Sequence, residues 1–430
     1  MSTASIAREL SDLAASALGV AFPVRVRAWD GSEYGPFDGP VLHIRDRTAL
    51  RRLLWSPDEL GLAQAYVVGE LDVDGDLAEG LRRVWSTARA AKLSGVRVSV
   101  GARLRALRAA AKWGVLGLRP PAPDLQARLD GELHSRDRDR AAIGYHYDLS
   151  NEFYQRLLDP YMAYSCGYWT SRAPGYGLVD AQRDKLELIC RKLDLRPGMR
   201  MLDVGCGWGS LSLYAAAEHG ARVVAVTLSA QQHDHVAGLV AQRGLGDRVQ
   251  VRLCDYRDVS DGPYEAVATV EMGEHVGRDG YPRFAARLHA LLAPQGRLLV
   301  QQMSRGANAP GGGAFIESYV APDMHMRPVG QTVDLLEQAG LEVRDVHAMR
   351  EHYVWTVQAW LDTLEGQWEQ FVALVGEPTA RVWRLYLVGG ALAFEEQRMG
   401  VDQILAVRPS DDGAGGMPDV RLRTPEKAAW

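Results

Sequence analysis

PGMRMLDVGCGWG, residues 197–209, is the stretch that best indicates the fold. Its apolar run 199–204 predicts a β-strand, the glycines after it predict a tight turn, and SLSLYAAAEHG at 210–220 has the pattern of a helix. A backbone that turns sharply beside a ligand needs glycine, because a Cβ atom would collide with its surroundings. Strand, glycine-rich turn and helix in this order are typical of the first unit of a nucleotide-binding α/β domain.

The spacing of the glycines points to one cofactor. Gly205, Gly207 and Gly209 form G-x-G-x-G after Asp203, whereas a dinucleotide fingerprint reads G-x-G-x-x-G. An acidic residue before G-x-G-x-G is typical of S-adenosylmethionine (AdoMet) methyltransferases, whose ligand has no pyrophosphate to place at a helix N-terminus. A strand–turn–helix without a ligand is the alternative that this motif leaves open.

Four more apolar runs suit strands that alternate with helices, at 222–228, 249–255, 264–272 and 296–303. We therefore predict an α/β class I AdoMet methyltransferase fold, a doubly wound and mostly parallel sheet, with helical insertions and a smaller N-terminal α+β domain. In such sheets the ligand lies beyond the carboxyl ends of the strands. The residues that stand there are Thr227, Leu228, Ser229, Gln232, Asp255, Tyr256, Glu271, Glu274, His275, Gln301, Gln302 and Met303.

Several of these strand-end residues have a predicted role. Asp255 and Tyr256 are placed to meet the edge of a base and to stack on its ring. Thr227 stands where many AdoMet enzymes have a carboxylate, so we expect Gln232 and backbone groups to bind the ribose. A carboxylate at Glu274, buried beside apolar surface, must be paired or protonated. A first-turn acid favoured by the helix dipole is the alternative for Glu274.

Length and composition favour a globular protein of two or three domains, with 430 residues, 47% of them hydrophobic, and a net charge of −5. The chain lacks a run of about 18 apolar residues that would predict a membrane span. Its N-terminus contains acidic residues and does not resemble a signal peptide. The four cysteines have neither disulfide-like nor metal-ligand spacing. We therefore expect reduced thiols, no metal and a cytoplasmic location.

We predict four segments along the chain. Residues 1–122 form a lipid- or membrane-docking domain, 123–140 a linker, 141–407 the methyltransferase domain and 408–430 a flexible tail. Aromatic residues are dense from 145 to 169 and predict an apolar pocket, with a packing layer as the alternative.

The N-terminal domain contains a basic segment, 80–120. From residue 80 to residue 123 the chain has ten Lys or Arg residues and no Asp or Glu, and Trp85 and Trp113 lie among them. This pattern suits an anionic lipid surface, such as the inner face of the plasma membrane. Nucleic acid and a solvated helix face are the alternatives.

Several motifs together resemble the cyclopropane fatty acid synthase family, which includes mycolic acid cyclopropane synthases and related fatty acid methyltransferases. They follow one another from about residue 140 to 405: GYHYDLSNEFYQRLLDPYMAYSCGYW, LDVGCGWGSLSLYAA, VTLSAQQ, CDYRD, EMGEHVG and GRLLVQQMS. The resemblance implies transfer of the AdoMet methyl group to a cis double bond of an acyl chain, through a carbocation. The acyl chain is usually part of a membrane phospholipid, which implies peripheral membrane association.

Position by position, the resemblance implies two sets of site residues. Together with Asp203, the AdoMet site would comprise Tyr164, Ser165, Gly205, Gly207, Gly209, Thr227, Leu228, Gln232, Asp255 and Tyr256. Relatives bind a bicarbonate ion that takes the proton, and its implied ligands here are Cys166, Glu274 and Tyr353. Gln301 replaces the family's His, and Gly273 replaces a bulky residue, both at the proton-removing site.

These departures favour the actinobacterial fatty acid methyltransferases of the family, which make 10-methylene chains, precursors of tuberculostearic acid, from oleoyl phospholipids. A cyclopropane product, a small-molecule methyltransferase and a non-catalytic lipid-binding protein are the alternatives. A nucleic-acid methylase is a further one, but VEMGEH stands where it would have a (D/N)PPY-type motif. The implied partners are an anionic phospholipid membrane, a reductase acting on the methylene product and a second copy of this chain, with no nucleic acid.

Overall fold

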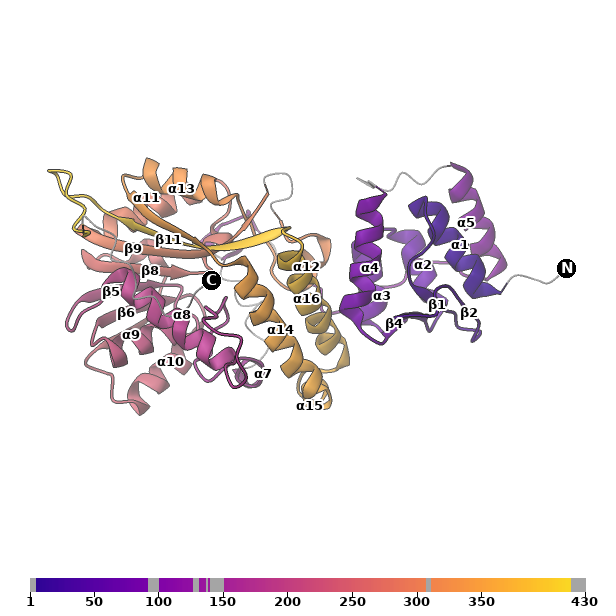
Figure 1. Cartoon of the computed structure of the whole chain (residues 1–430), viewed down its shortest axis with the longest axis horizontal. Coiled ribbons are helices and arrows are strands. Elements are labelled where there is room, and N and C mark those ends of the chain that lie inside the picture. The colour runs from indigo at the N-terminus through magenta and orange to yellow at the C-terminus, as the bar shows by residue number, and fades with distance from the viewer. Residues whose placement is uncertain are drawn as a thin grey trace. The chain divides into compact units, whose positions relative to one another are not determined.

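The computed structural model describes residues 5–91, 100–126, 131–136, 138–139, 151–306 and 311–418 (Figure 1). The chain divides into two compact units. The N-terminal unit comprises residues 1–128, 312–322 and 360–393, and the methyltransferase unit comprises residues 129–311, 323–359 and 394–430.

The methyltransferase unit is built on a sheet whose seven described strands lie in the order β10-β11-β9-β8-β5-β6-β7. They are β5 (Arg200–Val204), β6 (Arg222–Thr227), β7 (Val249–Leu253), β8 (Tyr264–Val270), β9 (Leu292–Arg305), β10 (Glu342–Ala348) and β11 (Met399–Val407). Strands β5 to β9 pair in parallel, whereas β11 is antiparallel to both of its neighbours. The prediction of a doubly wound, mostly parallel sheet is confirmed.

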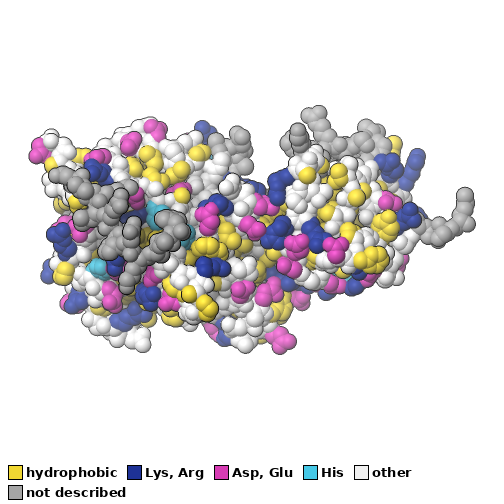
Figure 2. Space-filling model, viewed as in Figure 1, with side chains coloured by type: hydrophobic (Ala, Val, Ile, Leu, Met, Phe, Trp, Pro, Cys, Tyr) yellow, Lys and Arg dark blue, Asp and Glu magenta, His cyan; other side chains and the backbone are white. Residues whose placement is uncertain are grey.

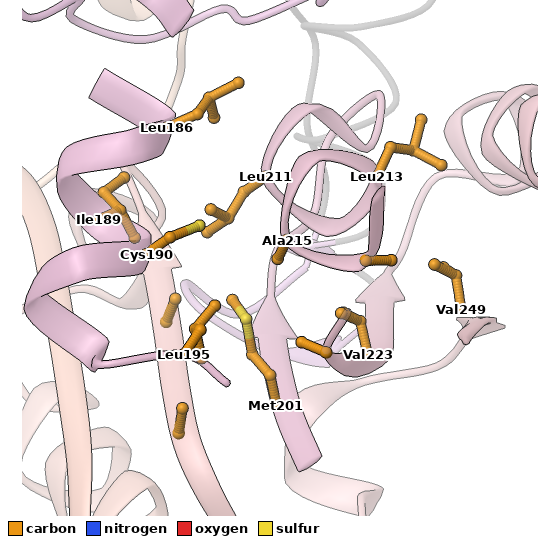
Figure 3. Close-up of a cluster of buried hydrophobic side chains, with 14 of the residues drawn as sticks. Leu186, Ile189, Cys190, Leu195, Met201, Leu211, Leu213, Ala215, Val223 and Val249 are labelled. Atoms are coloured by element: carbon orange, nitrogen blue, oxygen red, sulfur yellow. The ribbon is translucent and has the colours of Figure 1, made fainter. Parts of the chain in front are cut away.

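Helices cover both faces of this sheet. α8 (Leu178–Leu193), α9 (Ser210–Glu218) and α10 (Ala230–Gln242) pack on one face, and α11 (Tyr281–Leu291) and α13 (Val329–Gln338) pack on the other. Strand β5 contributes to both cores, because successive side chains of a strand point to opposite faces. Met201 lies in the first core, where Cys190 and Leu211 gather around it (Figure 3), and Leu202 lies in the second.

Shorter elements complete this unit. They are α7 (Asn151–Leu157), the 3-10 helices η1 (Tyr256–Asp258) and η2 (Gly273–Val276), and α14 (Arg350–Gly366), within which the boundary between the units falls.

The N-terminal unit contains a small sheet whose described strands have the order β2-β1-β3-β4. They are β1 (Arg25–Arg27), β2 (Glu33–Tyr34), β3 (Val41–Ile44) and β4 (Leu71–Asp74). The helices of the first 128 residues are α1 (Ile6–Leu18), α2 (Thr48–Trp55), α3 (Glu59–Val67), α4 (Leu77–Ala90) and α5 (Val100–Lys112). Later in the chain, α12 (Ala314–Tyr319), α15 (Trp368–Val375) and most of α16 (Glu377–Glu395) join the same unit.

This division differs from the predicted domains, because 312–322 and 360–393 cluster with the first 128 residues. Arg381 of α16 shows the reason. Its buried guanidinium donates to Asp72 Oδ2 of β4 at 2.9 Å and to the carbonyl of Tyr66 at 3.1 Å. A buried charge that is paired in this way fixes α16 against β4, at a sequence separation that order along the chain does not reveal.

Some predicted features lie outside the described residues. They are Lys92 and Arg97 of the basic segment, 127–130, 137 and 140 of the linker, the aromatic residues Tyr145 and Tyr147, and 419–430 of the tail. Among the residues that are described, no helix is both long enough and apolar enough to cross a lipid bilayer.

Candidate active site

The glycine turn after β5 has the shape that a bound ligand requires. Gly205, Gly207 and Gly209 have φ angles of 77°, 54° and 84°, in the left-handed region that favours glycine. A Cβ atom on Gly209 would lie 2.8 Å from the side chain of Val236 in α10, so the helix can pack on the turn only if that residue is glycine. A Cβ atom on Gly207 would meet nothing within 4 Å. The backbone there faces open space, as a ligand cradle must.

Polar side chains end β6 and β7 at the same edge of the sheet. Thr227 Oγ1 donates to Gln232 Oε1 at 2.7 Å, and both side chains are buried. Burial raises the pKa of Asp255, but bonds from Arg257 to both of its oxygens (2.8 and 2.5 Å) outweigh this and leave the pKa below its usual value. The backbone N of Arg257 also donates to Oδ1 at 2.9 Å, and an ionised carboxylate with three donors retains a lone pair for the amine of an adenine base. The set therefore fits AdoMet.

Aromatic rings stand beside the glycine turn. The ring centroid of Trp208 lies 4.4 Å from that of Tyr154 in α7, and Tyr164 lies 5.7 Å from Tyr154. Trp208 Nε1 also donates to Asn151 Oδ1 at 3.2 Å. The predicted AdoMet residue Tyr164 is thus part of an aromatic cluster at the turn.

Two other residues predicted to bind AdoMet interact within the protein. Asp203 is buried in β5, where its Oδ2 accepts from Ser212 Oγ of α9 at 2.6 Å, and burial raises its pKa to about 6. Ser165 Oγ accepts from the buried Nζ of Lys185 in α8 at 2.8 Å. The hydrogen bond of Asp203 joins β5 to α9, so we assign it a structural role.

The carboxylate at the centre of the site belongs to Glu271, directly after β8. Within the described part of the chain, three groups donate to it: Cys166 N (2.8 Å) and Gln301 Nε2 (2.9 Å) to Oε1, and Tyr353 OH (2.5 Å) to Oε2. Burial raises the pKa of Glu271, and the three donors together with the nearby Lys185 cation partly oppose this rise. A fixed carboxylate with a raised pKa is a stronger base than an exposed one.

The backbone holds Glu271 close to the glycine turn. Strand β8 runs parallel to β5 with Thr269 opposite Val204, and a Cβ atom on Gly205 would lie 3.0 Å from the side chain of Met272. Glu271 has a φ of 51°. This conformation costs a non-glycine residue about 1–3 kcal/mol, and such strain is concentrated at functional sites.

Glu271 is one of the predicted strand-end residues, but the sequence indicated no role for it. The available signal was a second carboxylate three residues before Glu274, in EMGEHVG at the end of a predicted strand.

Glu274, the predicted catalytic carboxylate, lies in η2 and has a different environment from Glu271. Its Oε1 accepts from the backbone N of Met303, whereas Oε2 is buried without a hydrogen-bond partner among the described residues. Burial, together with repulsion from Glu271, raises the pKa of Glu274 to about 8. Two carboxyl groups in one buried site do not both ionise. The three donors around Glu271 favour the charge on that residue, and the buried Oε2 of Glu274, which has no partner among the described residues, favours the proton on Glu274.

Cys166 lies at this centre, where its backbone N–H and not its thiol contacts Glu271. The buried thiol donates to the carbonyls of Gly167 (3.3 Å) and Met349 (3.8 Å), and burial raises its pKa far above the usual value. The backbone N–H of Cys166 is the group that reaches Glu271.

Gln301 positions Glu271 and cannot itself act as a base. Its Nε2 donates to Glu271, and its Oε1 accepts from Gln403 Nε2 at 2.9 Å. Gln403 is the register partner of Gln301 on β11 and is buried. It was not among the predicted site residues.

Gly273, which replaces a bulky residue of the family, packs directly against Gln302. A Cβ atom there would lie 2.3 Å from Oε1 of Gln302, whose side chain fills the space. Gln302 accepts from Tyr281 OH at 2.7 Å and donates to Thr332 Oγ1 at 3.0 Å. Gly273 therefore makes room for a second buried glutamine, directly beside Glu274 in η2.

The donors implied for a bicarbonate ion do not fit one. Cys166 N, Gln301 Nε2 and Tyr353 OH already donate to Glu271. A further anion would meet the charge of Glu271 and find these donors taken, and an uncompensated buried charge is strongly unfavourable. The carboxylate of Glu271 stands where the anion was expected.

Comparison with known proteins places these residues in a family context. The profile of the mycolic acid cyclopropane synthetase family matches residues 134–404. A probable fatty acid methyltransferase of Mycobacterium tuberculosis is 36% identical over 407 residues, covering 92% of this chain and 93% of that protein. A tuberculostearic acid methyltransferase of the same organism is 31% identical over 399 residues, covering 90% and 88%. The crystal structure of a mycolic acid cyclopropane synthase complexed with SAH and CTAB is 29% identical, with a TM-score of 0.58, covering 62% of this chain and 97% of that one.

Proposed function

This chain belongs to the mycolic acid cyclopropane synthetase family, and on that premise we propose that it converts the cis double bond of an oleoyl-type chain in a membrane phospholipid into a 10-methylene branch. AdoMet-dependent methylation of unsaturated acyl chains is the activity of the family. The 10-methylene product and the phospholipid carrier are the proposal. The observation that supports it is the Glu271 carboxylate, bound by Cys166 N, Gln301 and Tyr353.

AdoMet, when bound at the glycine turn, Gln232 and Asp255, supplies an electrophilic methyl group. Addition of methyl to one alkene carbon of the acyl chain leaves the neighbouring carbon as a carbocation. A hydride shift from the methylated carbon to this neighbour moves the charge to the branch point. Loss of a proton from the new methyl group then forms the exocyclic double bond. The Glu271 carboxylate accepts that proton, so the acyl product is neutral and Glu271 becomes the acid.

Glu271 suits this step because it is both charged and fixed. Attraction between a carboxylate and a carbocation is stronger in a buried site than in water. The ring of Tyr353, whose hydroxyl donates to Glu271, stacks on Phe394 with centroids 4.4 Å apart, which keeps that side of the carboxylate apolar.

The position of the base selects the product. A methyl proton removed before the hydride shift closes a cyclopropane, whereas one removed after it leaves a methylene branch. The Glu271 carboxylate is attached to the backbone, which fixes its position. A bicarbonate ion bound through the family's His would be positioned by side chains and could take a different position. The relative named as a tuberculostearic acid methyltransferase supports a branched product for this chain, since a 10-methylene chain is the precursor of that acid.

The test is incubation of the purified full chain with AdoMet and dioleoyl phosphatidylglycerol vesicles. Formation of S-adenosylhomocysteine (AdoHcy) reports methyl transfer. Proton NMR and gas chromatography–mass spectrometry of the fatty acid methyl esters separate the methylene product from its cyclopropane isomer. We expect vinylidene protons. A cyclopropane ring would refute the proposed product, and transfer to a soluble phenol or amine in preference to the lipid would refute the proposed substrate.

A further inference from the structure

A loop after α5, residues 114–119, lies along α2 in the N-terminal unit. Arg51 Nε donates to the carbonyl of Val115 at 2.9 Å, and Trp55 Nε1 donates to the carbonyl of Gly117 at 3.1 Å. The side chain of Val115 is buried between these contacts. The backbone of the loop is thus fixed on α2, which sets the direction of its remaining side chains.

Those remaining side chains are large, apolar and in water. Leu118 is 89% exposed, Trp55 54%, Leu116 52% and Leu54 38%. We call these four residues of α2 and the loop the docking face. Neighbouring exposed apolar side chains with a polar rim mark an interaction surface. Figure 2 shows hydrophobic side chains on the surface of the N-terminal unit, interspersed with Lys and Arg.

The charges beside the docking face are basic. Arg47 and Arg51 follow one face of α2 along the loop: a Cβ atom on Gly114 would lie 3.6 Å from Arg47 Nη1, and one on Gly117 would lie 3.2 Å from Arg51 Cζ. Arg119 follows Leu118 directly and is exposed. The rim of the face is therefore formed by three arginines.

Three exposed acids, Asp46, Asp58 and Glu59, also stand near α2 in the sequence, and Asp46 is close enough to Arg47 and Arg51 to interact with their charges. Asp46 accepts from the backbone N of Thr48 at the start of α2, and Asp58 accepts from that of Gly61 in the first turn of α3. From residue 80 to residue 123 the sequence contains no acid at all. Exposed apolar side chains with arginines beside them match acyl chains beneath anionic headgroups.

We propose that the docking face inserts into an anionic phospholipid bilayer, with its apolar side chains at the acyl boundary and Arg47, Arg51 and Arg119 at the headgroups. The proposal rests on the proposed function, because an enzyme that modifies an acyl chain of a membrane phospholipid must reach the membrane. A nucleic acid is a poorer match, since contacts to its phosphates are made by polar and charged groups and leave exposed leucines without a role.

The proposed contact lies on the loop and α2, although α5 also exposes Leu104 and Leu107, at 50% each. In α5, Lys112 pairs with Glu9 of α1 at 2.6 Å, and Arg105 donates to Ser16 of α1 at 2.7 Å. These two cations contribute to packing within the unit, so the predicted basic segment is divided between a structural part and the rim of the docking face.

Flotation of the full chain with vesicles tests the proposal without any turnover. The vesicles are phosphatidylcholine containing phosphatidylglycerol, compared with phosphatidylcholine alone. We expect Leu118→Glu to weaken binding to the anionic vesicles by at least about tenfold, because a charge replaces an apolar group that the bilayer would bury. Arg119→Gln should weaken binding about fivefold at low salt, and the difference should shrink at high salt.

The matched control is Phe37→Glu, which makes the same charge change in the same unit at a side chain that is 91% exposed. We expect this variant to bind as the wild type does. An equal loss for Phe37→Glu and Leu118→Glu, or wild-type binding by Leu118→Glu, would overturn the docking face. Binding of a duplex oligonucleotide that competes with vesicles and is unaffected by Leu118→Glu would overturn the choice of partner.

Turnover measurements separate the proposed membrane contact from the proposed methylation reaction. Leu118→Glu should lose turnover on vesicles but retain it on oleoyl lipid dispersed in detergent, because residue 118 contacts the membrane and not the active site. A wild-type chain that binds vesicles through the docking face but methylates no lipid would refute the proposed function and leave the docking face standing. Equal loss of turnover on vesicles and on dispersed lipid would refute the docking role.

Discussion

Replacing Glu271 by glutamine removes one negative charge from the active site and preserves its shape. The amide oxygen can accept from Cys166 N and Gln301 Nε2, as Oε1 does now at 2.8 and 2.9 Å. The Tyr353 hydroxyl, which donates to Oε2, can rotate and accept from the new amide nitrogen. We therefore expect the variant to fold and to bind AdoHcy with unchanged affinity.

The turnover of Glu271→Gln should fall steeply, because an amide cannot accept the proton. A positioned general base contributes about 10²–10⁴-fold to rate, which is about 3–5 kcal/mol of transition-state stabilisation. The decrease should appear in kcat, measured as single-turnover AdoHcy formation on oleoyl vesicles, with calorimetry of AdoHcy binding alongside. Glu265→Gln is the matched control, because Glu265 lies in β8 six residues before Glu271 and is exposed. Within the described part of the chain its side chain accepts from the backbone N of Arg200.

Truncation of the same side chain gives a second, independent test. Glu271→Ala leaves Cys166 N, Gln301 Nε2 and Tyr353 OH directed at an empty space, so added formate or bicarbonate should restore part of the lost rate. A Glu271→Gln enzyme with wild-type kcat would refute the assignment of Glu271 as the base. Loss of AdoHcy affinity in parallel with loss of rate would show that the residue acts through the fold instead.

Other predictions follow from the same residues. In the wild type, the pKa of Glu274 is raised from 4.5 to about 8, so between these pH values the native state binds more protons than the unfolded state. The free energy of unfolding should therefore fall as pH rises through this window, by about 1.4 kcal/mol per pH unit at most. Urea melts of Glu274→Gln should show a flatter dependence on pH, and a dependence parallel to that of the wild type would contradict the prediction. Gln403→Leu leaves the buried Oε1 of Gln301 unpaired, so it should lower stability by about 1–3 kcal/mol and reduce kcat more than AdoHcy affinity; an unchanged melting curve would count against the Gln403–Gln301 bond. Asp255→Ala should weaken AdoHcy binding by about 10–100-fold, as expected for a hydrogen bond to a charged group, and calorimetry would reveal an unchanged affinity. Cys166→Ser should leave kcat near that of the wild type, because the backbone N–H and not the thiol binds Glu271, and a large fall in kcat would restore a role for the thiol.

The glycine turn and most of the parallel sheet could be predicted because their determinants are local. The turn follows its strand directly, and the apolar runs 222–228, 249–255 and 264–272 coincide with β6, β7 and β8. Strand β11 was missed because Asp402 and Gln403 interrupt its apolar run. Both are satisfied across the sheet, since Asp402 accepts from Ser304 at 2.7 Å and Gln403 donates to Gln301. A sequence does not show such cross-strand partners.

The role of Glu271 escaped prediction for a related reason. Its donors lie 105, 30 and 82 residues away along the chain, at Cys166, Gln301 and Tyr353. The resemblance supplied a function for Glu274, and only the three-dimensional arrangement shows which of the two carboxyl groups has donors for both of its oxygens. The membership of α16 in the N-terminal unit depends in the same way on Arg381 and Asp72, which are far apart in sequence.

A proton acceptor that is part of the polypeptide is present in every folded copy of the enzyme. Its supply does not vary with aeration, with carbon dioxide tension or with the hydration of carbon dioxide, all of which set the level of a dissolved acceptor. Methylation by this chain should therefore proceed at the same rate in buffer stripped of carbonate by argon as in buffer open to air. A cell that uses such an enzyme can modify its membrane lipids at a rate that does not depend on the supply of carbon dioxide.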